Sequence, residues 1–446
     1  MYHYFLGVFM RLAFYIISVF LTSQSLLAQS IEGYVFVDIN KNFIMDSNEK
    51  GLSGVLVSNQ KDVVLTDTRG HFEIKPIEGN FIFVTKPESY QFKLDEFYNP
   101  EFYFLYQTKQ IKEELKYPVS APLDVIPEVL YFPVYENPGE EEHTCLLMGD
   151  PQMKNDKNLN YYKEGIIPFL ATKHSDFYVI LGDIAHNKLE ILPKEKQVSA
   201  TLGIPGYRVM GNHDMNLRAT DNNYANETFK SNYGPNYYSF DYANIHFVML
   251  DTEASDLDDD GEMLSWLKKD LEINKQKWLI AIMHHPPYSK GSHDSDNKRR
   301  SGGRLNAARE NIIPLLEQAG VDLVFSGHSH MYERSELMNC HYGLSDSFNS
   351  GFIRGKSNQS IYSKKGNRLS PYNGTIYAVV GSSSKVDVGP LDHPAMPHSY
   401  QEAGSMVVDV NNNILKAYFI NKSGKVKDRF EIIKGVEGGI ESKECK

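Results

Sequence analysis

An early part of the chain alternates between apolar and polar residues over short runs. Residues 31–87 contain IEGYVFVDI, GVLVSN, VVLTDT, HFEIK and FIFVTK, separated by Gly, Asn and Asp. Alternation over four to eight residues, bounded by turn formers, is typical of half-buried strands. The pattern predicts a small all-β sandwich, and the Tyr- and Pro-rich stretch that follows predicts the end of this module and a connector, so that the module covers residues 30–140.

The remainder of the chain has a different pattern of apolar residues. Strand-like apolar runs such as DFYVIL and WLIAIM alternate with plausible helices, including residues 158–171 and 304–319. Strands that alternate with helices are typical of α/β folds. We therefore expect a second, α/β domain over residues 141–434, followed by a short tail at 435–446.

The N-terminal residues have the features of an export signal. Residues 12–27, LAFYIISVFLTSQSLL, are largely apolar, with Arg11 before them and Ala28 after them. The run is short for a membrane span and suits the apolar region of a signal peptide. We expect translation to begin at Met10 and the segment 1–28 to be removed; the alternative is an uncleaved anchor. Both place the mature protein outside the cytoplasm, in the periplasm, at the cell surface or secreted.

Composition narrows the choice of partners. The net charge of the 446-residue chain is −11, which argues against a nucleic-acid partner because such binding needs Lys and Arg to neutralise phosphates. No membrane span is expected in the mature form. Of the three cysteines, Cys145 lies in an apolar run and is expected in the core. A Cys340–Cys445 disulfide is possible, but the sequence does not decide it, and it says nothing of the oligomeric state.

One loop of the β module has the ligand spacing of an EF-hand. DINKNFIMDSNE places oxygen donors at positions 1, 3, 5, 7, 9 and 12 of such a loop, namely Asp38, Asn40, Asn42, the carbonyl of Ile44, Asp46 and Glu49. Position 6, where the sharp turn normally requires Gly, holds Phe43. The stretch resembles the calcium-binding B-type repeats of bacterial surface proteins, and TDTRGHFEI resembles the carboxypeptidase-regulatory β-sandwich. We expect one structural Ca²⁺ here; the alternative is an Asn/Asp-rich hairpin loop without metal.

Five apolar runs of the second domain end in polar clusters. These clusters are Gly149-Asp150-Pro151-Gln152, Gly182-Asp183-Ile184-Ala185-His186, Gly211-Asn212-His213-Asp214, His284-His285 and Gly327-His328-Ser329-His330. In open α/β sheets, ligands bind at the carboxyl ends of strands. Two residues apart on extended backbone, the histidines of the last cluster share one face. We therefore expect the five strand ends to form one metal-binding site.

The series GD…GD…GNHD…HH…GHSH is similar to the motifs of the calcineurin-like metallophosphoesterases. MYERS after the last motif and GTIYAVVGSSSK further on resemble the purple acid phosphatases in particular. The resemblance covers roughly residues 141–434 and is weakest over about 336–371. It implies a four-layer α/β/β/α sandwich and a hydrolase that acts on phosphoric ester bonds.

The resemblance also implies two metal ions that share one carboxylate. Carried over to this chain, the ligands are Asp150, Asp183 and His330 for the first ion, and Asp183, Asn212, His284 and His328 for the second. His284 is preferred to His285 because it comes first after the strand. Mixed oxygen and nitrogen ligands suit Fe, Mn or Zn.

Two positions depart from the family's pattern. Purple acid phosphatases place a Tyr ligand three residues after the bridging Asp, where this chain has His186. Other branches use Asp-x-His in the first motif, where this chain has Asp150-Pro151-Gln152. Gln152, His186 or water must complete the first ion's shell, and Gln152 is favoured because DPQ with GDxxH occurs in another branch. Without tyrosinate the protein is not expected to be purple.

The implied reaction is attack by metal hydroxide on a phosphate ester, so no Ser or Cys nucleophile is required. His213 resembles the family's catalytic His, and Asp214 is expected to orient its ring. His293 matches the offset of a further His near the metals, although a solvated loop His explains it nearly as well. We expect a phosphomonoesterase; the alternatives are a phosphodiesterase of the same fold and an inactive surface or binding protein on this scaffold.

Overall fold

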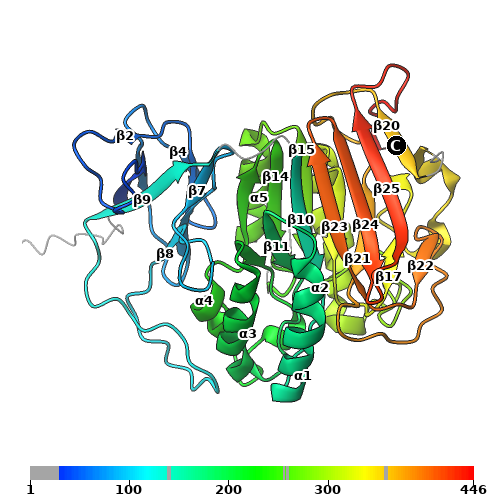
Figure 1. Ribbon diagram of the computed structural model, residues 1–446, viewed down its shortest axis with the longest axis horizontal. Coiled ribbons are helices and arrows are strands. Elements are labelled where there is room, and N and C mark those ends of the chain that lie inside the picture. Colours follow the sequence, from blue (N-terminus) through cyan, green and yellow to red (C-terminus); the bar gives the residue numbers. More distant parts are fainter. Residues whose placement is uncertain (1–29, 138–141, 255–256, 258–260, 356–359, 446) are drawn as a thin grey trace, which may run out of the picture.

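The computed structural model describes residues 30–137, 142–254, 257, 261–355 and 360–445 (Figure 1). The predicted signal peptide and the predicted boundary near residue 140 lie outside these residues. Within the described part of the chain, no helix is long and apolar enough to cross a membrane.

The N-terminal module is a β-sandwich, as the alternating pattern predicts. Its first sheet contains β1 (Ile31–Val37), β2 (Lys50–Gly51), β5 (His71–Ile74), β7 (Tyr90–Phe92) and β9 (Val129–Glu136). Its second sheet contains β3 (Leu56–Ser58), β4 (Val63–Leu65), β6 (Phe81–Val84) and β8 (Tyr103–Leu105). Alternate residues of β1, such as Ile31 and Val35, are buried in the core that the two sheets share, because successive side chains of a strand point to opposite faces.

The second domain is built on two seven-stranded sheets. In sheet order, the first contains β12 (Gly206–Arg208), β11 (Phe177–Ile180), β10 (Glu142–Met148), β23 (Gly404–Asn411), β24 (Ile414–Asn421), β25 (Val426–Lys434) and β20 (Ile361–Lys364). The second contains β13 (Tyr238–Tyr242), β14 (Ile245–Leu250), β15 (Trp278–Met283), β16 (Leu323–Ser326), β21 (Ile376–Val380), β17 (Tyr332–Arg334) and β22 (His398–Tyr400). A short pair, β18 (Leu337–Met338) and β19 (Ile353–Gly355), lies outside both. β10, β11 and β12 run parallel, as do β14, β15, β16 and β21.

Helices cover the outer faces of the two sheets. The described helices are α1 (Asp156–Tyr161), α2 (Ile167–Ala171), α3 (Leu192–Ser199), α4 (Glu227–Tyr233), α5 (Glu262–Ile273), α6 (Arg304–Ala307) and α7 (Ile313–Ala319). A π-helical turn joins α1 to α2 and another joins α6 to α7, so both predicted helices, 158–171 and 304–319, are present.

The pattern within β10 shows why the layers form. Leu146 and Met148 pack on the helix side with Leu159 and Leu170 of α1 and α2, whereas Leu147 faces the core between the sheets. A strand that is buried on both faces needs apolar residues at successive positions, which is why these runs are continuous rather than alternating. The predicted four-layer α/β/β/α sandwich with a preceding β-sandwich is confirmed.

The N-terminal module packs against the second domain (Figure 1). Phe83 of β6 meets Trp266 of α5 edge to face, with ring centroids 6.0 Å apart. Lys86 donates through Nζ to the carbonyl of Asp241 at 2.9 Å. Because these contacts are buried, the module is a fixed part of the molecule.

Candidate metal centre

The polar clusters follow strands whose carboxyl ends lie at one edge of the two sheets. Asp150 and Asp183 come after the adjacent parallel strands β10 and β11. His284 and His328 come after the adjacent parallel strands β15 and β16 of the other sheet. Both sheets therefore contribute side chains to one site. In α/β sheets, ligands bind just beyond the carboxyl ends of the strands.

One group of donor atoms comprises Asp150, Asp183 and His330, whose ligand atoms lie within 4.8 Å of one another. His330 Nε2 is 3.6 Å from Asp150 Oδ1. This nitrogen is buried and has no hydrogen-bond partner among the described residues. A buried polar atom without a partner costs free energy, so its position favours a bound cation.

A second group surrounds His284 Nε2. This atom lies 3.3 Å from Asp183 Oδ1, 3.2 Å from Asn212 Oδ1 and 3.3 Å from His328 Nδ1. Asp183 therefore belongs to the first group and also lies against His284 of the second. Two adjacent cation sites with one shared carboxylate would need this arrangement.

His285 is directed differently from His284. Its Nδ1 lies 2.9 Å from Thr252 Oγ1, and its Nε2 lies 3.3 Å from Glu253 Oε1. A ligand group of His284, His285 and His328 is geometrically allowed as well. The approach of His284 Nε2 to Asp183 and Asn212 favours His284 as the ligand.

The backbone around the centre is conformationally unusual. Asp150, Gln152, Asp183 and His328 have φ of 55°, 43°, 51° and 67°. Residues other than Gly adopt this left-handed region at a cost, and such residues concentrate at functional sites. These residues lie just beyond the ends of β10, β11 and β16, where the left-handed conformation turns the backbone sharply.

Close packing explains two of the motif glycines. A Cβ on Gly182 would lie 2.5 Å from His284 Nδ1, and a Cβ on Gly327 would lie 2.5 Å from Asp150 Oδ2. Larger residues at either position would displace a ligand side chain.

Gln152 and His186, the two alternatives for completing the first shell, lie in different places. Gln152 Nε2 is 2.9 Å from Asp183 Oδ2, so the amide already touches the shared carboxylate. His186 instead stacks on the ring of His213, with centroids 4.3 Å apart. The geometry favours Gln152, whose amide presents its oxygen to a cation after a flip.

His213 faces the centre through one nitrogen and is held by the other. Nδ1 is 2.9 Å from Asn187 Oδ1, and Nε2 is 4.0 Å from Asp183 Oδ2. Burial lowers the pKa of His213, and this effect outweighs the opposing charge of Asp183. The imidazole is thus positioned beside the shared ligand without being tied to it.

The expectation that Asp214 orients the His213 ring is wrong. The Asp214 carboxylate accepts the backbone N–H groups of Ile184, Ala185 and Gly211 at 3.1, 2.7 and 3.0 Å. Because the residues of a tight turn place successive side chains in different directions, Asp214 points back into the loop after Asp183. It fixes that loop, and Asn187 holds the ring.

His293 lies at the centre although it comes from a loop. Its ring centroid is 3.9 Å from that of His328, and Arg300 Nε lies 3.4 Å from its Nδ1. Burial, with the charge of Arg300, lowers the pKa of His293 to about 4. The segment KRRSGGR, residues 298–304, therefore borders the site, with Arg304 paired to Glu253.

Sequence reasoning missed several neighbours of the site residues, among them Asn187 and Ser301. Asn187 holds His213, and Ser301 Oγ lies 2.6 Å from His328 Nε2. Asn187 stands four residues after Asp183, where a motif search could have included it. Ser301 lies far from His328 in the sequence and offers no pattern to follow.

The loop with EF-hand spacing turns sharply at its sixth position even though that position is Phe43. Phe43 has φ of 64°, the left-handed conformation that Gly adopts at the sixth position of an EF-hand loop. Asp38 Oδ2 accepts the N–H of Phe43 at 2.8 Å, whereas its Oδ1 is buried without a hydrogen-bond partner among the described residues. Phe43 is thus no obstacle to the loop geometry.

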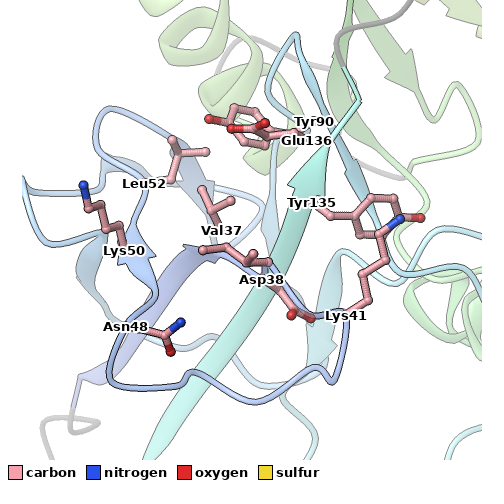
Figure 2. A pocket seen from close by; sticks show the side chains of 11 residues that line it. Val37, Asp38, Lys41, Asn48, Lys50, Leu52, Tyr90, Tyr135 and Glu136 are labelled. Carbon is pink, nitrogen blue, oxygen red and sulfur yellow. The ribbon is translucent and has the colours of Figure 1, made fainter.

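The other donors of this loop lie close to one another. Asp46 Oδ2 accepts the amides of Asn40 and Asn42 at 2.8 and 2.9 Å, and Glu49 Oε2 accepts the N–H of Asp46 at 3.0 Å. Figure 2 shows the neighbouring pocket, of about 660 Å³, with Asp38 at the start of the loop and Lys41 against the ring of Tyr135.

Both domains of the chain match models of known protein families. Residues 143–332 match the family model of the calcineurin-like phosphoesterase, and residues 40–121 match the model for the N-terminal part of such phosphoesterases. The chain therefore contains a calcineurin-like phosphoesterase domain with its N-terminal companion domain.

The similar proteins are purple acid phosphatases. Purple acid phosphatase 18 of Arabidopsis thaliana is 39% identical over 106 residues, which cover 23% of this chain and 22% of the relative. Purple acid phosphatase 23 of the same plant is 36% identical over 146 residues, or 30% of each chain. The matched part thus spans less than a third of either relative.

A solved structure has a similar fold over most of the chain. The purple acid phosphatase PPD1 from yellow lupin (Lupinus luteus) seeds superimposes with a TM-score of 0.53 at 16% identity, over 91% of this chain and 70% of that one. Identity this low establishes the fold alone, and the fold is the metallophosphatase sandwich described above.

Proposed function

We propose that this chain is an exported, dinuclear metal-dependent phosphoesterase that hydrolyses phosphate monoesters. The observation that carries the proposal is the pair of donor groups that share Asp183. The orphaned, buried His330 Nε2 and the mixed carboxylate, amide and imidazole donors fit transition-metal ions such as Fe, Mn or Zn. The purple acid phosphatase relatives support a phosphate ester as the substrate.

Two metal ions would supply activation of water and polarisation of the phosphoryl group. The residues that would hold them are Asp150, Asp183 and His330 for one ion, and Asp183, Asn212, His284 and His328 for the other. The chain's own residues position the two sites and contact the substrate. Asp183 keeps the two sites adjacent, and His213, held by Asn187, stands beside them to stabilise charge on the phosphoryl group or protonate the leaving oxygen. His293 and Arg300 border the same space and supply polar contacts to a substrate phosphate.

Elemental analysis of the purified protein, followed by parallel assays with p-nitrophenyl phosphate and bis-p-nitrophenyl phosphate, tests the proposal. We expect about two transition-metal ions per chain, faster turnover of the monoester, and no purple colour because position 186 is His. Faster turnover of the diester would select the phosphodiesterase alternative. Fewer than two ions with no turnover after reconstitution with Mn, Zn or Fe would select the inactive scaffold.

A disulfide bond, which forms in oxidising compartments, supports export. Cys340 and Cys445 form a disulfide in the structure, whereas Cys145 is free and buried. Disulfides persist chiefly in the periplasm and outside the cell. Together with the signal-peptide pattern, the bond favours a periplasmic, surface or secreted location.

The loop from Asp38 to Glu49 is proposed to bind one structural Ca²⁺. Its carrying observation is the buried, unpartnered Oδ1 of Asp38 inside a loop with EF-hand spacing. On the full chain, millimolar Ca²⁺ is expected to raise the Tm, because a ligand at 100 times its Kd stabilises by about 2.7 kcal/mol. Asp38→Ala should abolish the shift. Asp67→Ala, in a turn of the same module, should keep it, and an equal or absent shift in wild type and Asp38→Ala contradicts the proposal.

A further inference from the structure

The two ring nitrogens of His330 have different neighbours. Nε2 is directed to the first donor group, 3.6 Å from Asp150 Oδ1. Nδ1 lies on the opposite side of the ring, 2.6 Å from Asp387 Oδ2. The close contact places the ring proton on Nδ1, where it is donated to the carboxylate, and leaves the Nε2 lone pair free to bind a cation.

Asp387 is itself fixed in place. Its backbone N–H donates to the carbonyl of His330 at 3.2 Å, and Lys385 Nζ lies 3.0 Å from its Oδ1. The same residue pair is therefore joined by a side-chain contact and a backbone contact, which fixes both the position and the rotation of the imidazole.

The segment that carries Asp387 also reaches the other unshared ligand of the first group. Ser383 donates to the carbonyl of Gly149, and Ser384 Oγ donates to the carbonyl of Asp150 at 2.8 Å. Residues 383–387 thus contact the loops of both Asp150 and His330. These loops come from different sheets, and this one segment connects them.

Within the described residues, the outward nitrogens of His284 and His328 face no carboxylate. His284 Nδ1 lies 2.8 Å from the carbonyl of Leu181, and His328 Nε2 lies 2.6 Å from Ser301 Oγ. Both neighbours are neutral. Among the site histidines assigned as ligands, His330 alone is shown in the described residues with a carboxylate on its outward nitrogen.

We propose that Asp387 is a positioning residue that sets the affinity of the first metal site and leaves the second largely unaffected. The inference rests on the proposed dinuclear function. A carboxylate behind a metal-binding imidazole fixes its tautomer and orientation and raises its basicity, and loss of such a partner typically costs 10- to 100-fold in metal affinity. The effect is selective because Asp387 touches a ligand of one group only.

The test measures metal retained per chain against a series of chelator concentrations, for wild type, Asp387→Asn and Asp387→Ala. We expect both variants to lose one ion at about 10- to 100-fold lower chelator than wild type, Asp387→Ala more readily, and to keep the other. Asp387→Glu should restore part of the retention. The Tm of the metal-free variants should match that of the metal-free wild type.

Glu336→Gln is the matched control. Glu336 Oε1 also contacts a histidine, His398 Nε2 at 3.1 Å, but this pair lies outside both donor groups. Its metal retention should equal that of wild type. Retention of two ions by Asp387→Asn and Asp387→Ala at wild-type chelator levels would overturn the inference, as would parallel loss of both ions. A wild type that never holds two ions would instead overturn the proposed function.

Discussion

One ring nitrogen of His213 is fixed by a neighbour, whereas the other remains available to a substrate. Asn187 fixes Nδ1 at 2.9 Å, His186 stacks against one face, and Nε2 stands 4.0 Å from the shared carboxylate. A group at this distance does not occupy a ligand position, and it remains available to a phosphoryl oxygen. Its neighbour Asp214 instead accepts hydrogen bonds from backbone N–H groups, so the two adjacent residues have different roles.

His213→Ala should lower kcat by about 10²- to 10⁴-fold, because a positioned acid or base typically contributes that factor. Metal content should stay at the wild-type level, since His213 is no ligand in the proposed centre. The measurement is kcat on p-nitrophenyl phosphate with elemental analysis of the same sample. His186→Ala, which removes only the stacked neighbour, is the control and should change kcat much less. Unchanged kcat in His213→Ala would refute the assignment.

At the scale of elements, the carboxyl ends of parallel strands bring the candidate ligands together, and residues 383–387 border two of them. β23, β24 and β25 extend the first sheet, and β20 pairs with β25. The last described residues are tied back by the Cys340–Cys445 disulfide, across 105 positions of sequence. This cross-link restricts the unfolded chain over a long loop and so stabilises the fold.

Cys445→Ser should therefore lower the free energy of unfolding by about 2–4 kcal/mol, the usual range for loss of a native disulfide. Urea unfolding of the variant and of wild type, each with and without reductant, measures it. Reductant should lower the midpoint of wild type toward that of the variant and leave the variant unchanged. An identical midpoint for all four samples would show that the bond adds no stability.

Across the whole molecule, the N-terminal module and the second domain share a buried polar network. His246 lies between two carboxylates, with Nδ1 2.6 Å from Asp241 and Nε2 2.7 Å from Asp270. Ser239 Oγ donates to Asp270 and lies 2.9 Å from Thr85 Oγ1 of the N-terminal module. Burial would lower the pKa of His246, but the charges of Asp270 and Asp241 overcome it and raise the pKa to about 10.

This pKa predicts a loss of stability at alkaline pH. The unfolded chain releases the His246 proton near pH 6.5, whereas the folded chain keeps it to about pH 10. The contribution of His246 is therefore complete below pH 6.5 and declines as pH rises toward 10, by at most about 1.4 kcal/mol per pH unit. Urea unfolding at pH 6 to 9 should show a shallower decline for His246→Asn than for wild type. His174→Asn, at an exposed histidine, should follow wild type, and equal slopes for all three would contradict the prediction.

Several features of the fold follow from local sequence. Alternation over residues 31–87 gives a sandwich of short strands, and continuous apolar runs give strands buried on both faces, because the spacing of side chains along a strand is fixed by its geometry. The motif series likewise names the candidate ligands, since each follows directly on its own strand. The EF-hand spacing places Phe43 at the sixth position, and only the structure shows that Phe43 adopts the left-handed conformation there.

Other features depend on contacts that no short stretch contains. Asp214 was misassigned because adjacency in sequence does not give the direction of a side chain in a tight turn. Ser301 and Asp387 reach the histidines of GHSH from 27 and 57 positions away, and the disulfide joins residues 105 apart. The sequence by itself determined the strands, their polar ends and the kind of chemistry those ends support. Only the tertiary structure decided which distant side chains lie behind each candidate ligand, because those contacts arise when the two sheets and the segment 383–387 pack together.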